Sequence, residues 1–167
     1  MTRNSRLRLV GVALTALLGT ALSGCSAFGD GVGGCSDAPS SVLDAARTTA
    51  QSGFRYGQEG NVISKVEVLR ANSMPLPEDL QQFGATEIAI VWSDIYPRGN
   101  EDSAVPGVQG AAFFAAADDG TLIGPLDDLS AAAFDVSPPD DAGWSDWVSE
   151  VASSDTFHDA LGCGSPN

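Results

Sequence analysis

Catalytic chemistry in this chain would have to use its single histidine, because a hydrolase of the serine, histidine and acid type needs a base. That histidine is His158. No serine stands in the Gly-x-Ser-x-Gly turn that presents the nucleophile in many hydrolases. His158 lies near the end of an expected last helix, where a protonated imidazole would stabilise the negative helix terminus. The sequence therefore indicates no catalytic residue, and a hydrolase that uses His158 stays an alternative.

Paired aspartates are the second group of residues with possible chemistry, since hard cations such as Ca²⁺ take carboxylate oxygens as ligands. The pairs are Asp118-Asp119, Asp127-Asp128 and Asp140-Asp141. None falls within the D-x-[DN]-x-[DN]-G pattern of a calcium loop. One histidine and few cysteines are also too few ligands for a structural zinc site. We expect solvated loop charge, no metal and no cofactor, and a cation-binding domain stays a second alternative.

The first 24 residues have the order of parts of an export signal. Arg3, Arg6 and Arg8 form a basic head, and Leu9 to Leu22 is an apolar run that is too short for a membrane span of about 20 residues. The residues Leu22-Ser23-Gly24-Cys25 resemble the lipobox of bacterial lipoproteins, where a peptidase cleaves before an acylated cysteine. An ordinary secretory signal followed by an incidental thiol is the alternative.

The lipobox resemblance implies that residues 1–24 are removed and that Cys25 carries a diacylglycerol. Two acyl chains give stable anchoring, so membrane lipid would be one partner, at the extracytoplasmic face of the cell membrane. Residues 26–34 (SAFGDGVGG) are rich in glycine and are predicted to form a flexible tether. We therefore expect an anchor and tether over 25–34 and a single globular domain over 35–167.

The expected removal of residues 1–24 determines the net charge and the cysteine content of the mature chain. Five basic residues remain against 22 acidic ones, which gives the mature chain a net charge of −17. Such a surface repels nucleic acid, so we expect no nucleic-acid partner. Cys35 and Cys163 are left as an even pair in an oxidising compartment. We predict that they form a disulfide joining the two ends of the domain; two free buried thiols are the alternative.

Hydrophobic spacing predicts helices at both ends of the domain. A first helix runs from Ser40 to the residues before Gly53, with Ser41 as a candidate N-cap. A helical turn is expected at 78–83, and 126–136 is ambiguous between helix and loop. Trp144 and Trp147 lie on the apolar face of a late helix that also includes Val148 and Val151. We interpret these two tryptophans as core residues rather than ligand contacts.

Strands are predicted between the helices. Residues 61–70 alternate, with Val62, Val66 and Val68 on one face and Lys65 and Glu67 on the other. Residues 86–92 are apolar on both faces, as in an interior strand. Residues 111–117 and 121–123 flank an Asp-Gly pair that is typical of a hairpin. These patterns predict an α+β domain: an antiparallel sheet of about four strands with helices packed on one face.

A contact surface is expected in the loop between Ile95 and Gly110, which is rich in proline, glycine and acidic residues. Within it Tyr96, Arg98 and Asn100 are the candidate residues, expected to be exposed. Together these features favour a membrane-anchored, non-catalytic binding or accessory domain of the cell envelope, whose partner is an envelope protein or a small ligand.

Overall fold

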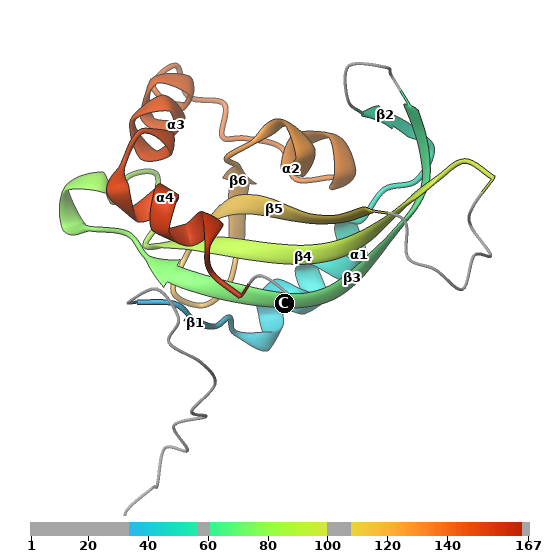
Figure 1. Ribbon diagram of the computed structural model, residues 1–167. Helices are drawn as coiled ribbons and strands as arrows, with labels where there is room; N and C mark the ends of the chain where they lie inside the picture. Colours follow the sequence, from blue (N-terminus) through green and yellow to red (C-terminus); the bar gives the residue numbers. More distant parts are fainter. Residues whose placement is uncertain (1–33, 57–60, 100–107, 165–167) are drawn as a thin grey trace, which may run out of the picture.

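The computed structural model describes residues 34–56, 61–99 and 108–164 (Figure 1). Within these ranges an antiparallel sheet of six strands is accompanied by four α-helices and one 3-10 turn. In chain order the elements are β1 (Ser36–Asp37), α1 (Ser40–Thr49), β2 (Phe54–Tyr56), β3 (Asn61–Pro75), η1 (Glu78–Leu80), β4 (Glu87–Pro97), β5 (Val108–Ala116), β6 (Leu122–Pro125), α2 (Asp128–Ala133), α3 (Trp144–Ala152) and α4 (Asp155–Leu161).

The α+β fold with an antiparallel sheet is confirmed, and the sheet has two more strands than expected. The additional strands, β1 and β2, are two and three residues long, too short to show an alternating pattern. Both pair with the same edge of β3, whose other edge pairs with β4. The strand order is therefore β1-β3-β4-β5-β6, and β2 pairs with the same outer edge of β3 as β1 but at the opposite end of the strand.

Strand β3 contains two register shifts, between Ile63 and Lys65 and between Val68 and Arg70. Each shift adds a residue on β3 and reverses the phase of the side chains. Ile63 is therefore buried in the same cluster as Val68, and Val62, its neighbour, belongs to the opposite phase. The prediction that Val62 shares a face with Val66 and Val68 was wrong for this reason.

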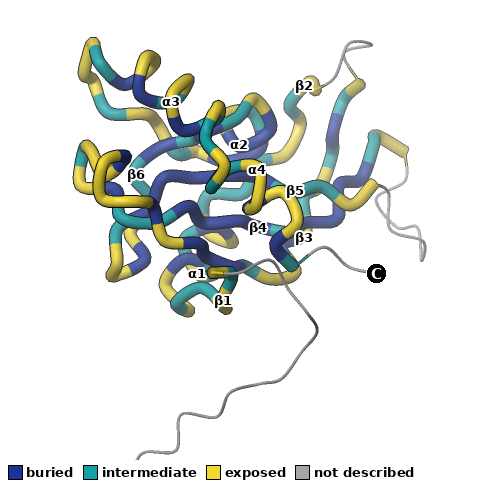
Figure 2. The backbone as a smooth tube through the Cα atoms, turned by 60° about the vertical axis from the view of Figure 1, so that its left-hand side comes forward, coloured by how far each residue is buried: buried dark blue, intermediate teal, exposed yellow. Residues whose placement is uncertain are grey.

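The core consists of two clusters, one on each face of the sheet. Ile88 and Ile90 of β4 belong to the cluster that contains α3 and α4 residues such as Trp147 and Val151. The intervening Ala89 and Val91 belong to the cluster of α1 and α2, whose members include Val42, Ala46, Leu129 and Ala133. Figure 2 shows that β4 and β5 are buried along most of their length. The expectation that the helices pack on one face of the sheet was therefore wrong: because β4 is apolar on both faces, helices cover both.

The two ends of the domain are joined by the predicted disulfide between Cys35 and Cys163, which are 128 positions apart in sequence. Their Cα atoms lie 5.7 Å apart, and Cys163 is buried. The bond connects the segment before β1 with the segment after α4. The predicted cysteine pair is therefore confirmed, whereas Cys25 and the tether over 26–33 lie outside the described residues.

The expected N-cap of the first helix, Ser41, does not cap it. Helix α1 has Pro39 as its N-cap, without a side-chain cap, and the Ser41 hydroxyl instead donates to the carbonyl oxygen of Asp119 at 2.8 Å. Ser41 thus links α1 to the turn before β6. Helix α2 is capped by Asp127, whose Oδ1 accepts from the backbone N–H of Ser130 at 2.8 Å. Residues 126–136 were ambiguous between helix and loop, and of these only 128–133 form a helix.

Candidate binding surface

His158 is on α4 and exposed to solvent. Its Nδ1 lies 2.8 Å from the carbonyl oxygen of Ser154, one helical turn earlier, so the ring donates to the backbone of its own helix. The Ser154 hydroxyl donates in turn to the carbonyl oxygen of Val151 at 2.6 Å. Among the described residues, no serine hydroxyl and no carboxylate is hydrogen-bonded to the imidazole. The geometry around His158 is that of a helix surface and gives no support to a nucleophile–base pair.

The acidic pairs stabilise turns and helix starts. Asp119 Oδ1 accepts from the backbone N–H of Thr121 at 2.9 Å, and hydrogen bonds from the Thr121 side chain and backbone hold the pKa of Asp119 below its usual value. Asp141 Oδ1 accepts from the backbone N–H of Gly143 at 2.8 Å. Asp127 caps α2. Within the described ranges no three histidine, cysteine or acidic side chains come together as a metal site would require.

Trp144 and Trp147 are core residues, as predicted. Their rings lie 4.9 Å apart between centroids, and each lies 5.5 Å from the ring of Phe83. The Trp147 indole N–H donates to the carbonyl oxygen of Leu80 at 2.8 Å in a buried position. Trp144 and Trp147 therefore fasten α3 to η1, and neither presents its ring as a ligand platform.

Of the three residues expected to form a contact surface, the structure describes two. Tyr96 is part of β4 rather than a loop and is only 7% exposed, with Lys65 of β3 lying over its ring. Its expected exposure was therefore wrong. Arg98 follows the end of β4, is exposed, and donates its backbone N–H to Val62 at 2.9 Å. Asn100 lies outside the described residues.

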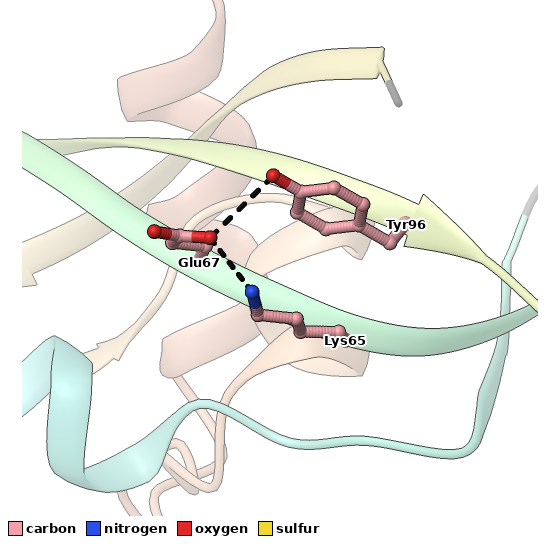
Figure 3. Close-up of polar contacts among 3 residues, drawn as sticks. All are labelled: Lys65, Glu67 and Tyr96. Carbon is pink, nitrogen blue, oxygen red and sulfur yellow. Dashed lines mark hydrogen bonds and ion pairs between the residues drawn. The ribbon is translucent and has the colours of Figure 1, made fainter. Parts of the chain in front are cut away.

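Tyr96 takes part in a polar cluster with two residues of β3 (Figure 3). Lys65 Nζ lies 2.8 Å from Glu67 Oε2 and 4.8 Å from the centre of the Tyr96 ring. The Tyr96 hydroxyl donates to the same glutamate oxygen at 3.4 Å. The hydrogen bond and charge of Lys65 lower the pKa of Glu67. Burial, and then the charges of Glu67 and Asp94, raise the pKa of Tyr96.

The cluster belongs to a larger basic surface along β3. After Gly24 the sequence has five basic residues, and all five lie on or beside this strand, exposed to solvent. They are Arg47 in the last turn of α1, Arg55 of β2, Lys65 and Arg70 of β3, and Arg98 after β4. Arg55 pairs with Val62, to which the Arg98 backbone is also bonded. We call this set the β3 basic surface.

Sequence reasoning missed this surface because its members are far apart along the chain. The spacing of Arg47, Arg55 and Arg98 shows no pattern. The pairing of β2 and β4 with β3 places Arg55 and Arg98 beside this strand, and the end of α1 places Arg47 there. Of the described acidic side chains, many lie on η1, in the turn before β6 and on α2, α3 and α4, but Glu67 is on β3 itself and Asp94 pairs with it on β4. Among the described residues the basic side chains are therefore grouped around β3, with acidic side chains interspersed among them.

Two open pockets flank α1. One, of about 440 Å³, lies between the end of α1 and β3 and is lined by Arg47, Ala50, Lys65, Val66, Glu67 and Val68. The other, of about 490 Å³, lies between α1 and the start of β6. In this second pocket the Ser41 hydroxyl donates a hydrogen bond to the carbonyl oxygen of Asp119, and the Thr49 hydroxyl donates to the carbonyl oxygen of Ala45. The first pocket adjoins the β3 basic surface and is the better candidate for binding.

Comparison of the chain with protein-family models, with curated proteins and with solved structures finds no match in any of the three. A search of the helices in the described ranges finds none with both the length and the apolarity that crossing a membrane requires. The assignment of a function to this domain therefore depends on its own sequence and geometry.

Proposed function

We propose that this protein is a bacterial lipoprotein, anchored through acylated Cys25, whose extracytoplasmic domain is a non-catalytic binding module of the cell envelope. The observation that carries the proposal is the Cys35–Cys163 disulfide, because such bonds persist in oxidising compartments outside the cytoplasm. Export is also what the first 24 residues indicate. Cys35 lies ten positions after Cys25 in the sequence. The disulfide would therefore hold the start of the domain in place directly after the tether.

The β3 basic surface supports the binding role. A domain that only spaced or anchored other parts would have no need to collect every basic side chain on one strand and its neighbours. Basic side chains grouped on a negatively charged protein favour association with an anionic partner and its orientation on encounter. The binding partner is therefore an acidic envelope protein or anionic ligand that approaches β3.

Anchoring can be tested by growing a bacterial host that expresses the full chain with a labelled fatty acid. The wild-type protein is expected to carry label and to fractionate with membranes, and Cys25→Ala is expected to lose both properties. Cys163→Ala, which removes a cysteine but leaves the signal intact, is the matched control and should keep its label. Label that persists in the Cys25→Ala protein would overturn the proposal.

A further inference from the structure

We infer that the groove between α1 and the start of β6 binds a small aliphatic amine, whose ammonium group is held at Asp135. This site is separate from the β3 basic surface and goes beyond the binding function proposed above, because its ligand has the opposite charge. The groove has a volume of about 490 Å³, a size typical of small-molecule sites. We call it the α1–β6 groove, and its lining residues are Ser41, Ala45, Thr49, Gly120, Thr121, Leu122, Asp135, Val136 and Ser137.

Three segments that are far apart in sequence form the α1–β6 groove. Helix α1 contributes Ser41, Ala45 and Thr49, which are spaced one helical turn apart and therefore lie along one side of the helix. The turn before β6 contributes residues 120–122, and the chain after α2 contributes residues 135–137. The backbone N–H of Asp135 donates to the Thr49 carbonyl oxygen at 2.8 Å, which fixes Asp135 beside the C-terminal end of α1.

The hydroxyl groups of the groove act as hydrogen-bond acceptors. The Ser41 hydroxyl donates to the carbonyl oxygen of Asp119 at 2.8 Å, and the Thr121 hydroxyl donates to the Asp119 carboxylate. The Thr49 hydroxyl donates to the carbonyl oxygen of Ala45 at 2.9 Å. A hydroxyl has one proton and two lone pairs, so these three groups can only accept a hydrogen bond from a ligand. The groove is therefore suited to a ligand that donates several hydrogen bonds.

Asp135 gives the groove a negative charge. It is exposed, and within the described ranges its carboxylate makes no hydrogen bond or ion pair. The lining residues in this part of the chain include no basic side chain. The adjoining last turn of α1 is the negative end of the helix dipole, which stabilises a cation. Arg47, the basic residue of that turn, lines the pocket beside β3 instead. A ligand group held at Asp135 is therefore cationic.

A primary ammonium group on an aliphatic chain matches this lining. It has three N–H donors, and charge-assisted hydrogen bonds to a carboxylate are stronger than neutral ones. A divalent metal ion is disfavoured, because Asp135 is the one carboxylate among the lining residues of the described ranges and such ions take several oxygen ligands. The apolar side chains of Ala45, Leu122 and Val136 form the remaining wall, which an alkyl chain can cover.

The direction of the ligand follows from the helix. Ser41 and Thr49 are separated by about 12 Å along the axis of α1, at about 1.5 Å per residue. The free N–H groups at the start of a helix disfavour a cation, so the ammonium group belongs at the Thr49 end, beside Asp135. The alkyl chain then extends past Ala45 toward Leu122. A neutral polyol would leave the Asp135 charge without a counter-ion.

The test uses the mature, lipidated protein in a non-ionic detergent, with pentylamine as the probe and backbone amide signals followed by NMR. We expect saturable shifts at residues 120–122 and 135–137. Pentanol and pentanoate have similar chains without the positive charge, and their affinities should be lower by about tenfold or more. Equal affinities for the three compounds, or shifts that rise with pentylamine without saturating, would overturn the inference.

A charge variant with a matched control separates this site from general attraction of cations to an acidic protein. Asp135→Asn keeps the shape of the side chain but removes its charge, and the affinity for pentylamine should fall about tenfold. Asp128→Asn removes the same charge from an exposed position on α2 that does not line the groove, and it should leave the affinity unchanged. Equal losses in the two variants would overturn the inference.

A steric variant provides a second arm. Ala45→Leu fills the middle of the groove with a residue that favours helix, so pentylamine affinity should fall about tenfold or more. Ala131→Leu, at an exposed position of α2, is the control and should bind as the wild-type protein does. Unchanged affinity in Ala45→Leu would contradict the inference; should that variant not fold, the aspartate variants decide. Absence of amine binding with intact fatty-acid labelling would overturn this inference and leave the proposed function standing.

Discussion

The indole N–H of Trp92 donates a hydrogen bond of 3.1 Å to the carbonyl oxygen of Cys163. Trp92 is on β4, and Cys163 is the disulfide partner of Cys35. On the neighbouring strand, the Arg70 guanidinium lies 5.8 Å from the Trp92 ring centre and donates to the carbonyl oxygen of Gly164. The end of the described chain is therefore held to the sheet by side chains as well as by the covalent bond.

Loss of the disulfide should destabilise the domain strongly. Because the bond closes a loop of 128 positions, its loss is expected to cost up to about 5 kcal/mol in the loop-entropy description. Urea unfolding with and without reductant would measure this cost. Cys25→Ser should show the same reductant effect as the wild-type protein, whereas Cys163→Ser should show none; an unchanged unfolding midpoint in reductant would contradict the prediction.

The buried Trp147 should contribute more to the free energy of unfolding than the half-buried Trp92. Trp147→Phe leaves the buried carbonyl oxygen of Leu80 without its 2.8 Å partner and should lower the free energy of unfolding by about 2 kcal/mol. Trp92→Phe removes the longer bond to Cys163 and should cost about 1 kcal/mol. Thermal or urea unfolding of both variants tests the order. A larger loss in Trp92→Phe would show that the C-terminal attachment dominates instead.

Asp127 should be the most sensitive of the paired aspartates. Its carboxylate accepts from the backbone N–H of Ser130 at 2.8 Å, from the Ser130 hydroxyl at 2.7 Å and from the backbone N–H of Phe113 at 2.7 Å. Asp127→Ala should therefore cost about 2 to 3 kcal/mol of stability, because a cap and buried donors lose their partner. Its exposed neighbour Asp128 is the control, and Asp128→Ala should change stability little. Equal effects of the two variants would contradict this account.

Alkaline pH should weaken the fold through Tyr96. Its pKa is raised in the folded protein, so the unfolded chain releases this proton first as the pH rises above 10.0, the ordinary value. The stability associated with the neutral phenol is complete below that pH and is lost as the pH rises through the folded pKa. Tyr96→Phe should remove this part of the alkaline loss, as followed by urea unfolding, and Tyr56→Phe should retain it. An identical alkaline profile in Tyr96→Phe would refute the assignment.

Long periodic segments could be predicted from the sequence, whereas short strands and long-range neighbours could not. The Trp144 and Trp147 stripe predicted α3 because several core contacts lie within one helix. Strand β2 has three residues and exists because it pairs with β3, so no local signal marks it. The burial of Tyr96 depends on its pairing with Lys65 across two strands. The grouping of basic side chains around β3 likewise depends on strand pairing and on where α1 ends.

The central claim, a lipid-anchored extracytoplasmic domain closed by one disulfide, is tested most directly by the intact mass of the protein purified from bacterial membranes. The account predicts a chain that begins at Cys25, carries the added mass of acyl groups on that residue, and gains about 2 Da on reduction as one disulfide opens. A chain that retains residues 1–24, or that begins elsewhere with an unmodified Cys25, would contradict it.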